Sequence, residues 1–178
     1  EQRSIDGTIK WRWLTADGLP VESVYMPDTE RKTLCVSSQV GCGMGCTFCL
    51  TATMGLLRNL TAGEIVDQVH RANRRLVELG EGEGPRPLTN LVFMGMGEPL
   101  ANIDALSTAI HCLTNKSWGL GWSPRRITVS TAGLAARLRD VAALGVNLAI
   151  SLNGTTEEQR QRLMPAVSQI ASLKTLMA

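Results

Sequence analysis

Three cysteines share one short segment of the chain, at the spacing C-x3-C-x2-C. They are Cys42, Cys46 and Cys49, and glycines lie before and between them. Three thiolates on one flexible loop can bind three irons of a [4Fe–4S] cluster and leave the fourth iron open. An open iron can chelate the amino and carboxylate groups of S-adenosylmethionine and donate one electron to its sulfonium. The spacing therefore predicts cleavage of S-adenosylmethionine to a 5′-deoxyadenosyl radical.

A structural zinc site is the alternative use of these thiols. Zinc prefers four ligands, usually beginning with a closely spaced cysteine pair, and a fourth ligand is hard to find in this chain. The two histidines, His70 and His111, fall within predicted helices and are expected on helix faces. The spacing therefore favours the cluster over zinc, and over a purely structural role for the thiols.

The other two cysteines lie outside this segment. Cys35 is inside the predicted strand before it, as either a small buried hydrophobic residue or a thiol directed toward the site. Residue type alone favours burial. Cys112 is late in a predicted helix and is expected in the core. An odd cysteine count without an export signal favours metal or catalytic thiols over a disulfide framework.

Glycines and short polar residues follow the later predicted strands. The carboxyl ends of parallel strands form the ligand-binding edge of an α/β sheet. A carboxylate or loop carbonyl there can receive an ammonium group, and hydroxyls can bind ribose. Each segment alone is also explained as a turn or a helix cap, but the repetition at successive strand ends favours a cofactor site. The residues concerned are Gly97, Glu98, Ser130, Thr131, Ser151, Leu152 and Asn153.

The elements that must position these residues alternate between apolar runs and amphipathic stretches, which is typical of β-α units around a parallel sheet. The first helix is predicted to begin with a capping box of Thr61 and Glu64, and the fourth with a box of Thr155 and Glu158. Four units are too few to close a barrel and leave the last strand with an unpaired edge. Buried strands are predicted at 33–37, 90–94, 126–130 and 147–152, with further helices at about 103–113 and 134–144.

Two regions are predicted along the chain. Residues 1–28, with short strands at 9–13 and 21–26, form a small N-terminal β extension, and residues 29–178 form the β-α domain. A chain of 178 residues that is 44% hydrophobic is long enough for one domain with a sizeable core. No apolar run is long enough to span a bilayer and no secretion signal begins the chain, so a cytoplasmic location is expected.

The charge and the tryptophans permit an RNA partner without arguing strongly for one. The net charge is +2, which is only mildly basic. The tryptophans stand near basic residues, a mixture suited to stacking on exposed bases, although partly buried tryptophans in surface loops are the alternative. They are Trp11, Trp13, Trp118 and Trp122.

Taken together, the motifs resemble the radical S-adenosylmethionine family of adenine-C2 RNA methyltransferases, which act on 23S ribosomal RNA and transfer RNA. The resemblance runs from about residue 21 to residue 165 and is specific. It implies a partial (β/α)6 barrel, here with about four β-α units, in which the three cysteines of the C-x3-C-x2-C segment bind the cluster. The implied partners are the two RNA classes and an electron donor such as flavodoxin, without membrane or DNA. The matching segments are VESVYMP, TLCVSSQVGCGMGCTFC, RNLTAGEIVDQV, VFMGMGEPL, ITVSTAGL and LAISLNGTTEEQRQRLMP.

The resemblance also assigns roles to single residues. Gly97 and Glu98 meet the methionine end of S-adenosylmethionine. Glu22 occupies the position of a proton acceptor. Cys35 matches the thiol that resolves a protein–RNA adduct by forming a disulfide with a methyl-carrying cysteine. The rest of the nucleotide contacts Ser130, Ser151, Leu152 and Asn153.

The family's methyl-carrying cysteine and one further cofactor-binding asparagine lie beyond the end of this chain, and its N-terminal RNA-binding extension is largely absent. We therefore expect this 178-residue chain to bind the cluster without turning over as a methyltransferase, whereas a full-length relative methylates C2 of adenosine. Two alternatives stay open: a C8 adenosine methyltransferase with similar motifs, and a non-catalytic iron–sulfur or RNA-binding module.

Overall fold

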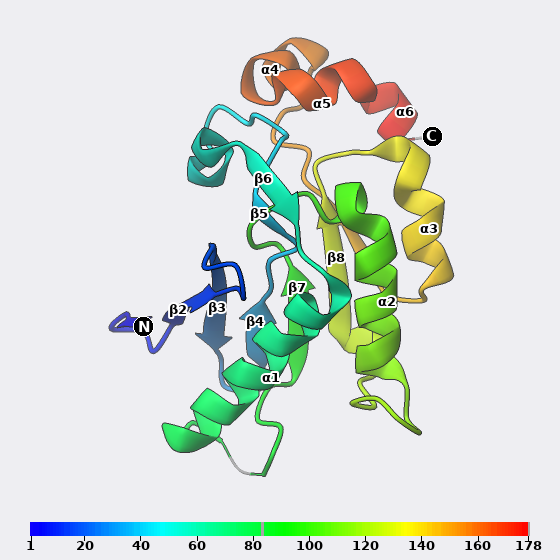
Figure 1. The fold of residues 1–178 in the computed structure, drawn as a ribbon. Coiled ribbons are helices and arrows are strands. Elements are labelled where there is room, and N and C mark those ends of the chain that lie inside the picture. Colours follow the sequence, from blue (N-terminus) through cyan, green and yellow to red (C-terminus); the bar gives the residue numbers. More distant parts are fainter. Residues whose placement is uncertain (83, 178) are drawn as a thin grey trace.

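The computed structural model describes residues 1–82 and 84–177, and one seven-stranded sheet forms its centre. The strands are β1 (Gln2–Arg3), β2 (Ile9–Leu14), β3 (Pro20–Pro27), β4 (Lys32–Cys35), β7 (Asn90–Phe93), β8 (Ile127–Thr131) and β9 (Asn147–Ile150). They lie side by side in that order. Figure 1 shows the first three α-helices alongside the sheet and the last three beyond the carboxyl ends of its parallel strands. The first four strands pair antiparallel, whereas β4, β7, β8 and β9 run parallel.

The sheet confirms the predicted α/β class and the strands predicted from the sequence. The N-terminal strands continue the same sheet as the β-α units, since Val24 of β3 lies opposite Cys35 of β4. The chain passes between the two predicted regions in a tight turn, in which the Asp28 N–H donates to the Arg31 carbonyl oxygen at 2.8 Å. The antiparallel strands therefore form one lateral wall beside the parallel ones.

The first helix begins at the predicted capping box. The Thr61 hydroxyl accepts a hydrogen bond from the Glu64 N–H (3.2 Å), and the Glu64 carboxylate accepts one from the Thr61 N–H (2.8 Å). The apolar stripe of this helix then packs on the sheet. The α-helices of the described residues are α1 (Ala62–Glu78), α2 (Ile103–Thr114), α3 (Leu138–Ala143), α4 (Glu157–Leu163), α5 (Pro165–Ile170) and α6 (Leu173–Met177).

Two predicted helix starts were wrong. The cap of α4 is Thr156, whose hydroxyl accepts from the Gln159 N–H at 3.2 Å. Gln159 also replaces Glu158 as the reciprocal partner, because its side-chain oxygen accepts from the Thr155 N–H at 2.9 Å. The third helix begins later than predicted, because Ala135–Arg137 form a 3₁₀ turn before α3.

A two-stranded hairpin, β5 (Gln39–Gly41) with β6 (Leu56–Asn59), was not predicted. Its strands are short and partly polar, so they carry little periodic signal. Gly41 has φ +77°, and a Cβ at this position would lie 1.9 Å from the Gly55 carbonyl oxygen. Only glycine therefore permits the hairpin to close, and the hairpin brackets the loop that carries the three clustered cysteines.

The last parallel strand is less buried than predicted. Asn147 is exposed, and Leu148 keeps 40% of its surface accessible. Within the described residues, β9 is the end of the strand order and pairs only with β8. An edge strand is covered on fewer sides than a central one, which explains the difference.

Alternate residues of the strands point to opposite faces of the sheet. Side chains such as Leu34, Leu91 and Val129 face the helices in the main core. Their neighbours form what we call the second face, which is turned away from the helices. The second face comprises Lys10, Arg12, Glu22, Val24, Cys35, Val92, Thr128, Ser130, Asn147 and Ala149.

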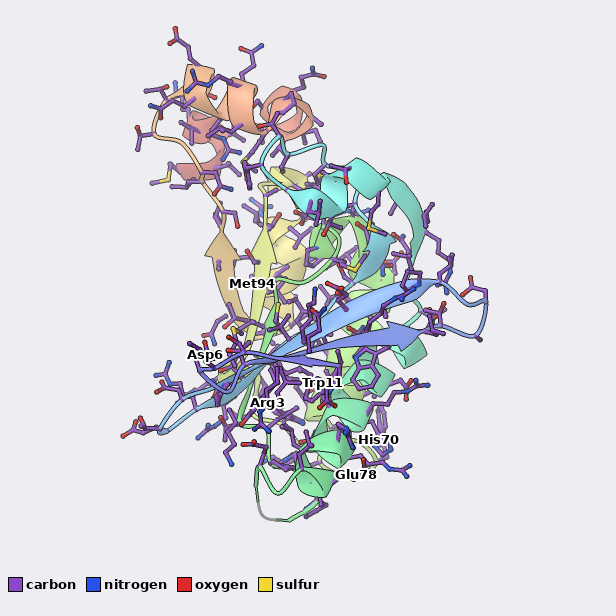
Figure 2. The ribbon with its side chains drawn as sticks, turned by 90° about the vertical axis from the view of Figure 1, so that its left-hand side faces the viewer. Arg3, Asp6, Trp11, His70, Glu78 and Met94 are labelled. Atoms are coloured by element: carbon purple, nitrogen blue, oxygen red, sulfur yellow. The ribbon has the colours of Figure 1, made fainter. Side chains whose placement is uncertain are left out.

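The tryptophans divide between buried and exposed positions. Trp11 and Trp122 are buried, and Trp118 is 66% exposed. Figure 2 shows Trp11 close to the helix that carries His70 and Glu78. Burial removes Trp11 and Trp122 as stacking surfaces for RNA bases and leaves Trp118 exposed.

His70 and His111 lie exposed on helix faces, as predicted. Cys112 differs from its predicted core position, because it is only partly buried and lines a groove with His70 between α1 and α2. Among the described residues, no helix is long and apolar enough to cross a membrane.

Candidate functional site

One cavity of about 350 Å³ opens at the carboxyl ends of the parallel strands β7, β8 and β9. The cysteine loop forms one side of it, and the loops after the strands form the others. Most of the residues predicted for the site meet here: Cys42, Cys46, Cys49, Gly97, Glu98, Ser130, Ser151 and Asn153. Leu152 and the pair Glu22 and Cys35 are not part of the lining.

The cysteine loop is anchored at two points. The Cys42 N–H donates to the Gly55 carbonyl oxygen at 2.9 Å, which ties the loop to the β5–β6 hairpin. The Thr47 N–H donates to the Leu163 carbonyl oxygen at 2.9 Å, which ties it to the end of α4. These bonds hold three free, partly exposed thiols against one cavity.

The thiols are close enough to influence one another. Burial raises the pKa of Cys42 and of Cys46, and the neighbouring cysteines and the Glu98 carboxylate raise the pKa of both further. A cationic group bound between the thiols would offset this repulsion. The cavity therefore suits a positively charged metal group.

The donor set fits a cluster better than a single ion. In the described part of the chain, no three His, Cys, Asp or Glu side chains surround one point as ligands of a metal ion. In an iron–sulfur cube each thiolate binds a different iron, so the cysteines need a common cavity rather than a common point. Cys42, Cys46 and Cys49 provide that cavity.

Glu98 is buried at the floor of the site, with 3% of its surface accessible. Its carboxylate accepts the Ala132 N–H at 2.8 Å and the Leu100 N–H at 3.1 Å, and its own N–H donates to Gln39 Oε1 at 2.8 Å. Burial raises the pKa of this carboxyl group. The side chain thus joins the loop after β7 to the end of β8.

Gly97 occupies a position at which no side chain would fit. Its φ is +98°, and a Cβ would lie 2.5 Å from the Gln39 Cβ. Glycine therefore permits the loop after β7 to approach β5 closely, and this approach fixes the position of the Glu98 backbone.

The ends of β8 and β9 present hydroxyl and amide groups. The Ser130 and Ser151 hydroxyl oxygens are 3.2 Å apart. Asn153 has φ +53°, and its Nδ2 donates to the Met164 sulfur at 3.5 Å. A left-handed backbone at a non-glycine residue is common for asparagine and is held here by the surrounding turn. These groups give the cavity a polar wall suited to a ribose.

Glu22 and Cys35 lie on the second face, outside the cavity lining. The Glu22 carboxylate is 3.3 Å from the Lys10 amino group. Cys35 is buried, and desolvation raises the pKa of its thiol to about 11, against a hydrogen bond from the Met94 backbone. The strand register places Glu22 and Cys35 near each other. Cys35 pairs with Val24, which follows Glu22 by two residues and lies on the same face.

Several buried polar residues that support the site were not predicted. Gln68 on α1 accepts from the Ser23 hydroxyl (2.9 Å) and the Ser37 N–H (3.0 Å). Asn102, directly before α2, donates to the Ser38 and Leu60 carbonyl oxygens, both at 2.8 Å. Gln68 had a visible signal, since it falls within the apolar stripe of its helix.

Comparison with known proteins agrees with this geometry. The family model of the radical SAM superfamily matches residues 36–177. The dual-specificity RNA methyltransferase RlmN of Anaeromyxobacter sp. (strain Fw109-5) is 67% identical over 93% of this chain and 44% of its own length. RlmN 2 of Myxococcus xanthus (strain DK1622) is 57% identical over the same shares.

A solved structure shares the fold. The radical SAM methyltransferase from Sphaerobacter thermophilus is 43% identical, with a TM-score of 0.90 over 99% of this chain and 50% of that one. The chain thus spans about half the length of the relatives it matches. The family match over most of the chain, on the strands and loops that form the cavity, shows that this chain belongs to the radical SAM superfamily.

Proposed function

We propose that this chain is the radical-forming part of an RNA methyltransferase that modifies C2 of adenosine in 23S ribosomal RNA and transfer RNA. One observation carries the proposal: three free cysteines share a cavity with the glycine, carboxylate and hydroxyl groups at the ends of β7, β8 and β9. Relatives named as dual-specificity RNA methyltransferases contain the same stretch of chain.

In this proposal Cys42, Cys46 and Cys49 bind a [4Fe–4S] cluster through their thiolates. When bound, the cluster supplies the electron that cleaves S-adenosylmethionine. The chain's own task is to bind the nucleotide and aim it. Glu98 contributes because each carboxylate oxygen that accepts one backbone N–H can accept a second donor, such as an amino group.

The polar wall of the cavity orients the rest of the nucleotide. In this proposal the Ser130 and Ser151 hydroxyls and the Asn153 amide, which line the cavity, bind the ribose and adenine edges. Leu152 supplies backbone groups to the same turn rather than a side chain to the lining. Gly97 keeps the loop after β7 close enough to meet the methionine end.

Glu22 and Cys35 act on the RNA side in this proposal. They share the second face, across which the target base would lie, and Lys10 holds the Glu22 carboxylate in place. Glu22 accepts a proton from the base. Cys35 releases the protein–RNA adduct by forming a disulfide with a methyl-carrying cysteine outside this chain.

The proposal also includes an electron donor such as flavodoxin and a cytoplasmic location, where both RNAs occur.

The test uses the chain reconstituted anaerobically with iron and sulfide. Incubation with S-adenosylmethionine and dithionite should release 5′-deoxyadenosine, and a Cys46→Ala variant should not. Uptake of zinc in a closed four-ligand site, or no 5′-deoxyadenosine from a folded and iron-loaded sample, would refute the proposal. Nucleoside analysis of transfer RNA treated with a full-length relative separates C2 from C8 methylation.

A further inference from the structure

Arg160 of α4 is fully buried, with 0% of its surface accessible, yet it carries a guanidinium group. Nη1 donates to the Leu152 carbonyl oxygen at 2.6 Å and to that of Ser151 at 3.4 Å, and Nη2 donates to that of Ala132 at 3.1 Å. One side chain therefore binds the backbone that follows both β8 and β9.

The Ala132 peptide is held from both sides. Its N–H donates to the Glu98 carboxylate at 2.8 Å, and its carbonyl oxygen accepts from Arg160. Glu98 belongs to the loop after β7, so the chain Glu98–Ala132–Arg160–Leu152 links the ends of three adjacent parallel strands. These ends carry the polar wall of the cavity.

This arrangement is not explained by stability alone. The hydrogen bonds of Arg160 go to carbonyl oxygens, with a weaker contact to the Met164 sulfur at 3.9 Å. Its Nε is buried without a hydrogen-bond partner among the described residues. Burying a charge is unfavourable, and well-packed hydrophobic side chains often serve stability better at such positions. What the arginine adds over a hydrophobic side chain is the set of hydrogen bonds that join the turns after β8 and β9.

The neighbouring backbone makes room for the guanidinium. Gly133 has φ +125°, and a Cβ there would lie 3.3 Å from Arg160 Nη2 and 2.9 Å from Leu176 Cδ1. The glycine in the turn after β8 thus leaves space for the Arg160 side chain that donates a hydrogen bond to this turn.

We propose that Arg160 is the positioning residue of the nucleotide cavity: it fixes the turns after β8 and β9 so that Ser130, Ser151 and Asn153 face S-adenosylmethionine together. This inference rests on the proposed function. It assigns Arg160 no contact with the nucleotide, because its side chain is not part of the cavity lining.

The test compares Arg160→Met, Arg160→Lys and the matched control Arg162→Met, an exposed arginine on the same helix. Each chain is reconstituted with iron and sulfide. Three quantities are measured: iron content, the Kd of S-adenosylmethionine by calorimetry, and amide hydrogen exchange resolved by peptide.

We expect Arg160→Met to keep its iron and to raise the Kd by about tenfold or more, the size of effect seen when a residue that orients the ligands of a metal site is removed. Exchange should accelerate in the peptides around residues 131–133 and 150–153 and stay unchanged in α1. Arg160→Lys should recover part of both effects, and Arg162→Met should match the unsubstituted chain.

Unchanged Kd and unchanged local exchange in Arg160→Met would overturn the inference, and so would faster exchange spread evenly over the whole sheet. If Arg160→Met fails to fold, the Kd and the local exchange of Arg160→Lys, compared with those of the unsubstituted chain, test the inference instead. If the unsubstituted chain does not bind S-adenosylmethionine, the proposed function fails, and the exchange of the two turns still decides whether Arg160 holds them.

Discussion

The five cysteines differ more by environment than by type. Cys42, Cys46 and Cys49 are partly exposed around one cavity, Cys35 is buried in β4, and Cys112 lines a groove between helices. Spacing predicted the first three as a group, because a short loop keeps its residues together. The sequence did not reveal the partial exposure of Cys112, which depends on how α1 and α2 pack.

Removal of one clustered thiol should abolish cluster binding. In Cys46→Ala the cluster loses one of three protein ligands, so iron and sulfide content and the visible absorbance of the reconstituted chain should fall close to background. Cys112→Ala is the matched control and should retain full iron. Equal iron in both variants would contradict the assignment of Cys46.

The Cys35 thiol should react slowly with alkylating agents. Its pKa of about 11 leaves about one thiol in a thousand ionised at pH 8. Iodoacetamide labelling of the folded chain, read by mass spectrometry, should therefore modify Cys35 far more slowly than Cys112. The rate should rise as the pH increases toward 11, since more thiolate forms. Rapid labelling of Cys35 at pH 8 would show that the thiol is accessible and ionised.

Among the elements, periodicity predicted the long strands and helices, and local chemistry predicted the start of α1. The features that the sequence did not predict are those that depend on contacts between residues far apart in the sequence. The β5–β6 hairpin depends on the close approach of Gly41 to Gly55. Arg160 reads as a surface residue of a short polar helix, and only the packing of α4 over the strand ends buries it. Such residues could not be assigned from residue type and spacing.

The capping box of α1 should contribute measurably to stability. Thr61→Ala removes the hydroxyl that accepts from the Glu64 N–H, and we expect the free energy of unfolding to fall by about 1 kcal/mol. Thr108→Ala, within α2, removes only a bond to the Asp104 carbonyl oxygen of its own helix. Its effect should be near zero or slightly stabilising, because alanine favours helix. Urea unfolding of both variants checks the difference.

At the largest scale, one edge of the sheet formed by the described residues offers more backbone for pairing than the other. The strand at one edge, β1, has two residues, whereas β9 at the other has four and an exposed leucine. An accessible edge with apolar side chains promotes association between chains. This feature follows from the strand order, which the sequence predicted only as an unpaired last strand.

Charge placed on β9 should reduce self-association. Leu148→Lys adds a cation to the exposed edge, so the apparent mass by size-exclusion chromatography with light scattering should depend less on concentration than in the unsubstituted chain. Leu120→Lys is the matched control, since Leu120 is also 40% exposed but lies in a loop. An equal reduction by the control would mean that general surface polarity, not the strand edge, is responsible.

The second face has a consequence for how a long ligand would lie on it. Lys10 and Arg12 on β2 carry two positive charges against the single Glu22 carboxylate on β3, whereas Ser130 and Ala149 on β8 and β9 are neutral. A polyanion such as RNA that crosses the sheet would therefore meet an electrostatic gradient. Its phosphates would be drawn toward β2, and an uncharged base ring would lie against β8. The orientation would be set before any bond changes. Because screening by salt weakens attraction between exposed charges, high ionic strength would release the phosphate end first and leave the ring in place.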